Sequence, residues 1–430
     1  MASLKRRGQN SFAVFYYYTN EAEEDIKHWE SYKDELSAMQ RKSFIDYLQK
    51  NGNVDAIRDA AMRYKQEREV IAPAKSSDGR AASRTTAEMK KLTIGELFDM
   101  WLPIYVQKNR LKPNTYDNHT RVMANHIMPY FEKQPVATIT ALGIDQFIEH
   151  LNRKKCQGSK SYNKKIDDVP TLSSSSVKKV YDCLYLLLKA AKAWGVMDEI
   201  PETAAPGVKY AKRMYWTHEK IKYALDHIRD NRLLHLAVHI AFICSLRLGE
   251  IMGLPIDAIN FEEGSLTIRQ TLQRVSNEAL RKTPKDEILF EFPKIVLSSK
   301  STVILTKPKT EESERVVYFN PHLARELRER LAQIERDRKY MGYSNGDYSN
   351  YGLLFAHPNG NPIEPHLLER WLKAWQVAND IEPRIDMQGM RKSSSMYKLR
   401  VNNFNYQEVQ GDTGHTTPTV LMKHYNEVII

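Results

Sequence analysis

The 430-residue sequence has few cysteines and no long apolar run. Cys156, Cys183 and Cys244 lie far apart and form no metal-binding pattern, so we expect reduced thiols in a cytoplasmic protein. No stretch of about 18 apolar residues is present, and the start, MASLKRRGQN, lacks the apolar segment of a signal peptide. We therefore expect neither a membrane span nor secretion. The sequence also lacks internal repeats, a glycine-rich phosphate loop and a zinc motif.

Positive charge, by contrast, is in excess. The chain has 64 Lys and Arg against 53 Asp and Glu, a net charge of +11, together with 23 tyrosines. Such a surplus indicates a polyanionic partner, although a membrane surface or an acidic protein would satisfy the charge alone. The length predicts about two to four domains.

The first part of the chain combines basic residues with a strand pattern. Residues 4–20 alternate aromatic and apolar side chains, which predicts one strand with two distinct faces. A short strand around Trp29 should follow, then helices over 34–50 and 54–69. This small sheet is either an appendage or a DNA-binding surface, in which case its candidate contacts are Lys5, Arg6 and Arg7.

A linker and a helical region come next. Residues 66–91 are small, polar and basic without periodicity, as is typical of a linker. Residues 92–210 predict four helices, the first opened by a capping box of Thr93 and Glu96. The clearest is the fourth, whose apolar residues from Val177 to Trp194 form one buried stripe. The others begin near Pro113 and after Thr140.

The remaining residues, 211–430, predict a mixed α/β domain. We expect strands at 265–272, 302–306 and 315–319, with a long polar insert over 273–301 to which the sequence assigns no role. Helices are expected over 217–243, in two pieces, and over 321–340, 364–379 and 388–400.

Several polar residues of this domain suit phosphate chemistry. Arg247 lies in the apolar run from Ile243 to Leu254 and needs a buried anionic partner or a ligand. Lys309 lies at the predicted turn between two strands. Arg391 offers a fork of donors to phosphate, His415 offers one donor, and the phenol of Tyr425 can attack phosphorus.

The order Arg247, Lys309, Arg391, His415, Tyr425 resembles the catalytic set of the tyrosine recombinases, the phage-integrase family. The segment Leu-Arg-Leu-Gly-Glu and the Gly-His pair ahead of the tyrosine are similar to that family's motifs. The sequence departs from the family at one position, where Gln388 replaces the usual histidine of the H-x-x-R motif.

The resemblance implies a role for each of these residues. Arg247 and Arg391 would clamp the non-bridging phosphate oxygens, and His415 would donate one more hydrogen bond. Tyr425 would attack to form a 3′-phosphotyrosine, and Lys309 would protonate the departing 5′ oxygen.

Two further residues have supporting roles in this interpretation. Glu250, three residues after Arg247, would orient the arginines. Gln388 could bond phosphate but could not take a proton from a phenol. Because the covalent link retains the bond energy, no ATP, metal or other cofactor is implied.

The resemblance also implies a domain order and a set of partners. It indicates an arm-site-binding domain over 1–65, a linker over 66–91, a core-binding domain over 92–210 and a catalytic domain over 211–430. The partners would be double-stranded DNA at core and arm-type sites and DNA-bending accessory proteins. Further copies of the chain would form a tetramer, and the reaction would proceed through a Holliday junction. The protein would serve the integration or excision of a mobile element in the bacterial cytoplasm, at the nucleoid, with no membrane partner.

Three alternatives remain open at this point. A type IB topoisomerase would use a similar set of residues to relax supercoiled DNA. A catalytically silent DNA-binding regulator would leave the five polar roles unexplained, and so would an α/β domain with scattered charges.

Overall fold

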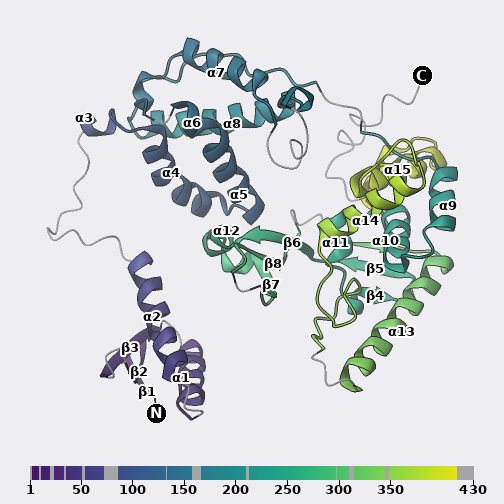
Figure 1. Cartoon of the computed structure of the whole chain (residues 1–430), viewed down its shortest axis with the longest axis horizontal. Helices are drawn as coiled ribbons and strands as arrows, with labels where there is room; N and C mark the ends of the chain where they lie inside the picture. The colour runs from purple at the N-terminus through teal and green to yellow at the C-terminus, as the bar shows by residue number, and fades with distance from the viewer. Residues whose placement is uncertain are drawn as a thin grey trace. The chain divides into compact units, whose positions relative to one another are not determined.

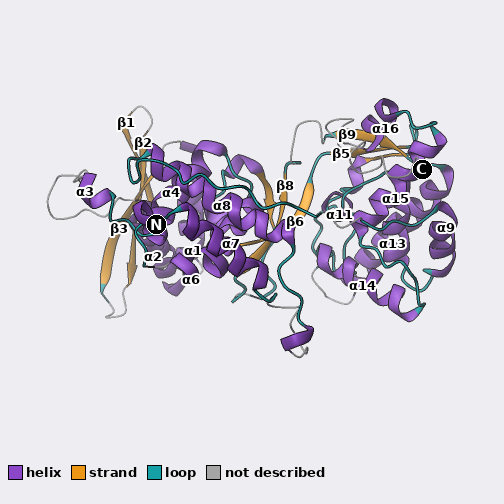
Figure 2. Cartoon of the chain, turned by 90° about the horizontal axis from the view of Figure 1, so that it is seen from above, coloured by secondary structure: helices purple, strands orange, loops and turns teal. Residues whose placement is uncertain are grey.

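The chain folds into two compact units, Met1–Arg84 and Thr85–Ile430, in the computed structural model (Figure 1). Helices make up most of it, and the strands form small three-stranded sheets (Figure 2). None of the described helices combines the length and the apolar character needed to cross a bilayer. The structure describes residues 2–8, 11–19, 24–32, 35–50, 54–71, 86–131, 133–156, 166–209, 213–296, 298–308, 314–343 and 348–413.

The first unit is an antiparallel sheet, in the order β1-β2-β3, packed on two helices. Our prediction of a single strand over residues 4–20 is wrong, because β1 and β2 are separate strands that pair with each other. The polar Gly-Gln-Asn segment interrupts the apolar alternation there, and these residues favour a turn. The elements are β1 (Ser3–Gly8), β2 (Ser11–Thr19), β3 (Asp25–Tyr32), α1 (Glu35–Lys50) and α2 (Val54–Ile71).

The two faces of β2 differ as the alternation predicts. Val14, Tyr16 and Tyr18 are buried in the core with residues of α1 and α2. On the opposite face, Tyr17 is exposed, and Phe15 pairs with the exposed Trp29 of β3. The sheet therefore presents aromatic side chains away from its helices.

The second unit begins with a helical bundle. The capping box of Thr93 and Glu96 opens α4, as predicted, and the stripe of α8 is buried from Val177 to Ala191. Gly195 follows α8 with a φ of 70°, a conformation that glycine adopts without strain. The elements are α3 (Thr86–Met89), α4 (Ile94–Asn109), α5 (Pro113–Val122), a π-helical turn (Met123–Ile127), α6 (Met128–Phe131), α7 (Ala141–Arg153) and α8 (Ser174–Ala193).

The rest of the second unit surrounds a large apolar core with helices and two sheets. Its helices are α9 (His218–His227), α10 (Arg232–Ile243), α11 (Leu248–Met252), α12 (Asn277–Lys282), α13 (Pro321–Tyr343), α14 (Pro365–Ala378), α15 (Met387–Val401) and α16 (Tyr406–Thr413). Its strands are β4 (Ile259–Asn260), β5 (Ser265–Ile268), β6 (Thr271–Ser276), β7 (Ile288–Glu291), β8 (Ser301–Thr306) and β9 (Arg315–Tyr318).

The strand pairing corrects two predictions. The single strand expected over 265–272 is divided into β5 and β6, which belong to different sheets, ordered β4-β5-β9 and β6-β8-β7. The strands on either side of Lys309 were expected to pair as a hairpin, but β8 pairs with β6 and β7, whereas β9 pairs with β5. Strands β6 and β7 pair with β8 on both of its edges, so β8 does not pair with β9, the next strand in the sequence.

The polar insert over 273–301 is therefore a folded element, with strands and the helix α12. It packs against the bundle, because the side chain of Ala279 is buried among bundle residues. The hydroxyl of Tyr116 on α5 donates to Glu278 (2.6 Å), and the backbone N–H and hydroxyl of Ser276 donate to Asp117 (2.9 and 2.5 Å). Lys112 forms an ion pair with Glu287, and Arg110 forms one with Asp286.

Candidate active site

Arg247 stands at the junction of α10 and α11. The apolar helix α10 ends before Cys244, and Arg247 is the residue that precedes α11. Glycines let α11 lie against β6: a Cβ on Gly249 would come within 2.8 Å of Thr271 Cγ2, and one on Gly253 within 2.8 Å of the Leu272 nitrogen. The glycine spacing of this motif thus serves close packing of the helix that follows the arginine.

Glu250 holds Arg247 in place. Its carboxylate accepts the Arg247 backbone N–H (2.9 Å) and Nη1 (2.7 Å), and Arg315 on β9 donates to the same two oxygens (2.9 and 3.4 Å). The Glu250 side chain is 3% exposed and that of Arg315 7%, while that of Arg247 is 40% exposed. The carboxylate is buried, yet one of its arginines reaches solvent.

The two arginines also fix the charge of Glu250. Burial alone would raise the pKa of this carboxyl, but the charges and hydrogen bonds of Arg315 and Arg247 outweigh burial and hold its pKa below the usual range. Glu250 is therefore ionised at neutral pH and acts as a fixed anionic anchor rather than as a proton donor.

Arg391 is tied to the same region from α15. Its side chain is buried, with Nη1 donating to the Ser245 carbonyl and Nη2 to the Thr413 carbonyl, both at 2.5 Å. The hydroxyls of Ser245 and Ser394 lie 2.5 Å apart and join α15 to the same turn. Because Ser245 precedes Arg247 by two residues, these bonds place the Arg391 guanidinium beside the turn that leads into Arg247.

The other predicted site residues have different outcomes. Gln388, one turn before Arg391 on α15, is half-buried, and its side chain makes no hydrogen bond to another described residue. Lys309, His415 and Tyr425 lie outside the described residues. The description ends at Thr413, whose carbonyl accepts from Arg391, two positions ahead of His415.

Three contributors to the site were missed by the sequence analysis: Arg315, Ser245 and Thr413. Arg315 pairs across the sheet with Ile268, so it reaches Glu250 only because β9 lies beside β5. The signal available in the sequence was a charge within the apolar strand Arg-Val-Val-Tyr, which by itself names no partner.

One cluster in the described part of the chain could hold a metal ion, and it lies elsewhere on α10 and on α13. It consists of His235, His239 and Glu326.

Comparison with known proteins shows which family the chain resembles. Residues 93–152 match the family model described as "Phage integrase, N-terminal SAM-like domain". A protein named integrase, from Staphylococcus phage L54a, is 19% identical over 357 residues, which cover 80% of this chain and 92% of that protein. The chain therefore resembles the tyrosine recombinases of the phage-integrase family.

Solved structures share the fold of this chain. The integrase of the transposon Tn1549, in complex with a circular intermediate DNA, is 14% identical, with a TM-score of 0.56 over 78% of this chain and 95% of that chain. A lambda integrase tetramer bound to a Holliday junction is 12% identical, with a TM-score of 0.51 over 98% and 96% of the two chains.

The first unit of the chain contains the remaining predicted residues. Lys5 on β1 pairs with Ala13, on the sheet face away from the helices, where the exposed Lys27 pairs with Tyr17. Arg6 is exposed on the other face, with its guanidinium 5.9 Å from the ring centre of Phe12. The side chain of Arg7 lies outside the described ones. Lys27 was not singled out from the sequence.

Proposed function

We propose that this recombinase performs site-specific integration and excision of a mobile element, and that Tyr425 forms the 3′-phosphotyrosine intermediate. The observation that carries the proposal is the pair of arginines held at one turn. Arg391 is bonded to the carbonyl of Ser245, and Arg247, two residues later, is anchored by Glu250 with 40% of its side chain exposed.

Such an arrangement suits a scissile phosphodiester. Negative charge grows on the phosphoryl oxygens as the nucleophile attacks, and fixed cationic donors stabilise that charge without reorganising. Arg247 and Arg315 together bring two positive charges to the one negative charge of Glu250, and 40% of the Arg247 side chain is exposed. We assign Arg247 and Arg391 to the phosphoryl oxygens and Glu250 to positioning Arg247.

The remaining roles rest on the motif order. His415 would donate to the same oxygens, and Lys309 would protonate the departing 5′ oxygen. The half-buried side chain of Gln388 has no hydrogen-bond partner among the described residues, so it is available to the phosphate as a neutral donor.

We further propose the assembly and the DNA contacts. The lambda relative was solved as a tetramer on a Holliday junction, and the same assembly would let this chain exchange strands between two duplexes. Residues 92–210 and 211–430 would hold the core site in the cytoplasm, at the nucleoid, with DNA-bending proteins as auxiliaries. Residues 1–65 would bind arm-type sites through the sheet face that bears Lys5, Lys27 and Trp29, and Arg6 and Arg7 are further candidate contacts from the sequence.

The test is to trap the covalent intermediate. In DNA that is nicked just downstream of the cleavage position, the short fragment that carries the freed 5′ hydroxyl diffuses away after the attack. The protein–DNA adduct therefore accumulates, and its linked peptide can be mapped. We expect the link at Tyr425 and none in Tyr425→Phe, whereas the control Tyr406→Phe should retain it. A link at another tyrosine would overturn the assignment.

The same DNA tests the topoisomerase alternative. A recombinase should exchange strands between two copies of its site and leave a supercoiled plasmid without sites unrelaxed. Relaxation of any plasmid, without exchange, would favour a type IB topoisomerase. No covalent adduct on any DNA would favour a silent regulator.

A further inference from the structure

We propose that His235, His239 and Glu326 form a binding site for a divalent transition-metal ion, with zinc as the preferred occupant, which fastens α13 to α10. The strand-transfer chemistry requires no metal, so the role of this ion is structural. The site is independent of the proposed function.

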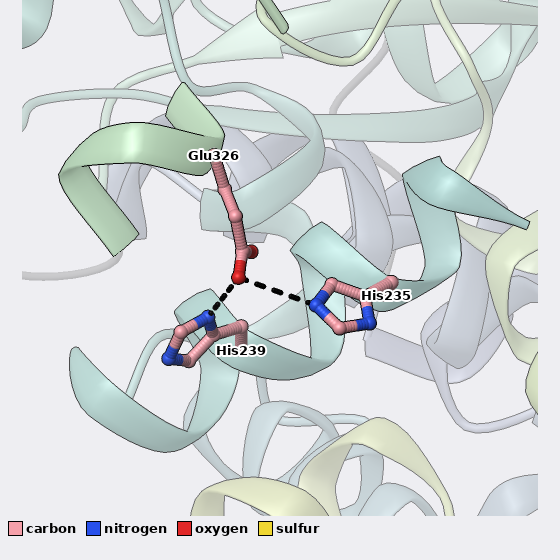
Figure 3. Close-up of side chains that lie close together, drawn as sticks. All are labelled: His235, His239 and Glu326. Atoms are coloured by element: carbon pink, nitrogen blue, oxygen red, sulfur yellow. Dashed lines mark hydrogen bonds and ion pairs between the residues drawn. The ribbon is translucent and has the colours of Figure 1, made fainter. Parts of the chain in front are cut away.

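The three side chains converge from two neighbouring helices (Figure 3). His235 and His239 are four residues apart on α10, so they lie on the same face of that helix. Glu326 reaches toward them from α13, with its Oε1 3.2 Å from His235 Nε2 and 3.0 Å from His239 Nδ1. All the potential ligand atoms lie within 4.8 Å of one another.

These separations are close to those around a tetrahedral zinc ion. Nitrogen and oxygen ligands about 2.0–2.1 Å from zinc lie roughly 3.3–3.4 Å apart at tetrahedral angles. A shift of a few tenths of an ångström would admit the ion between the two rings and the carboxylate. Two imidazoles and one carboxylate suit zinc, and they leave a fourth position for water.

Glu326 has an unused oxygen that indicates a missing ligand. Its Oε2 is buried, and within the described residues it has no hydrogen-bond partner. A buried carboxylate oxygen is costly to leave unsatisfied. A bound ion would engage it directly as a second ligand atom, or through the water in the fourth position.

The charges around the carboxylate lead to the same conclusion. The ion pairs of Glu326 within the described chain are made only with His235 and His239, without a lysine or an arginine. A carboxylate at 20% exposure needs a positive partner, and a divalent ion supplies one while both imidazoles stay neutral. The side chain of His235 is 24% exposed, which gives an ion a route into the site.

The site has a mechanical consequence for the arginine cluster. The helix α10 leads directly into the turn that carries Ser245 and Arg247, and it packs against α13 and α15. A metal bridge from α10 to α13 would restrain the helix behind that turn. We therefore expect the ion to raise the melting temperature of the second unit while leaving single-turnover cleavage within about twofold.

The experiment uses the full-length protein without a histidine tag, stripped of metal with EDTA and dialysed. Zinc chloride is titrated by calorimetry, and cobalt(II) is added separately to read its visible spectrum. We expect one high-affinity equivalent per chain, a cobalt spectrum typical of tetrahedral coordination by nitrogen and oxygen, and a higher melting temperature with zinc.

Variants locate the site. His239→Gln and Glu326→Gln should each weaken zinc binding by about a hundredfold or more, since each removes a direct ligand. His366→Gln is the matched control, because His366 lies 3.4 Å from Glu364 in an imidazole–carboxylate pair that is not part of the three-residue cluster of the described chain. Zinc binding should be unchanged in that variant.

Two outcomes would overturn the proposal. One is the absence of saturable zinc binding and of a tetrahedral cobalt spectrum in the unmodified protein, a result that depends on no variant. The other is binding that survives in both folded variants, which would place the ion elsewhere. In either case the histidines serve only as hydrogen-bond partners of Glu326.

Discussion

Two buried glutamates, one in each unit, hold arginines in different ways. Glu30 in the first unit is 0% exposed and accepts Nε and Nη2 of Arg41, each at 2.7 Å, as well as the hydroxyls of Tyr16 and Tyr32, each at 2.5 Å. Glu250 in the second unit is 3% exposed and accepts from two arginines.

The difference is one of charge. At Glu30, one carboxylate meets one guanidinium that is 21% exposed, so the pair is neutral and faces inward. At Glu250, one carboxylate meets two guanidinium groups, those of the buried Arg315 and the half-exposed Arg247. A glutamate–arginine pair is thus part of the core in the first unit, whereas in the second unit it holds the half-exposed Arg247, which we propose contacts the phosphate.

The largest effect should come from Arg41→Ala. This change leaves Glu30 buried without its cation, and breaking a buried pair in this way costs about 3–5 kcal/mol. Hydrogen exchange across β2 and β3 of the full-length protein should accelerate accordingly. The control Arg58→Ala, which breaks an exposed pair with Asp55, should cost about 0–1 kcal/mol. Unchanged protection of β2 in Arg41→Ala would contradict the structural role of the pair.

Arg247→Ala should show the opposite pattern. We expect cleavage of nicked DNA in a single turnover to fall about a hundredfold or more, as when one oxyanion donor is removed. Stability should change little, because Arg315 keeps Glu250 paired. Arg269→Ala, at an arginine of similar exposure paired with Asp257, is the control and should cleave normally. If Arg247→Ala instead unfolded the protein while each folded molecule cleaved DNA normally, Arg247 would have a structural role.

Gln388→Ala should have a smaller effect. A neutral hydrogen bond to the phosphate is worth about 0.5–1.5 kcal/mol, so cleavage should slow by roughly tenfold. Gln388→His should change the rate little between pH 5.5 and 9, with at most a shallow titration near the histidine pKa of about 6.5. A hundredfold gain with that titration would instead identify the position as one for a proton-transferring base.

The smallest effect at physiological pH is the change in stability caused by protonation of Glu30 and Glu250. The folded pKa of both Glu30 and Glu250 is below the ordinary value of 4.5, so the unfolded chain binds more protons in acid. Their contribution to stability is therefore complete above about pH 4.5 and is lost as pH falls through the folded pKa values. Denaturant midpoints of Glu250→Gln should depend less on pH below 4.5 than those of the unmodified protein. An equal dependence would show that Glu250 contributes nothing to acid unfolding.

Much of the fold follows from local patterns in the sequence. The capping box at Thr93 and the stripe of α8 depend on residues a few positions apart, and both are confirmed. The hairpin around Lys309 was wrong because consecutive strands usually pair, whereas here the inserted β6 and β7 flank β8. Pairings between distant segments have no local signal.

The same limit applies to the site. Arg247 and Glu250 are three residues apart, so their contact could be read from helical spacing. Arg315 meets Glu250 across 65 positions, and Arg391 meets Ser245 across 146, so both contacts depend on how the helices and sheets pack. The assignments of Lys309, His415 and Tyr425 remain predictions.

The connection from Thr306 to Arg315 has its two ends in different sheets. It starts from β8, whose sheet includes Ser276, and Ser276 is hydrogen-bonded to the bundle helix α5. It ends at β9, whose Arg315 donates a hydrogen bond to Glu250. By sequence, Lys309 belongs to this connection, one end of which is joined to the bundle and the other to the arginine cluster. We therefore propose that proton transfer by Lys309 to the leaving strand depends on both the packing of the bundle and the arginine cluster.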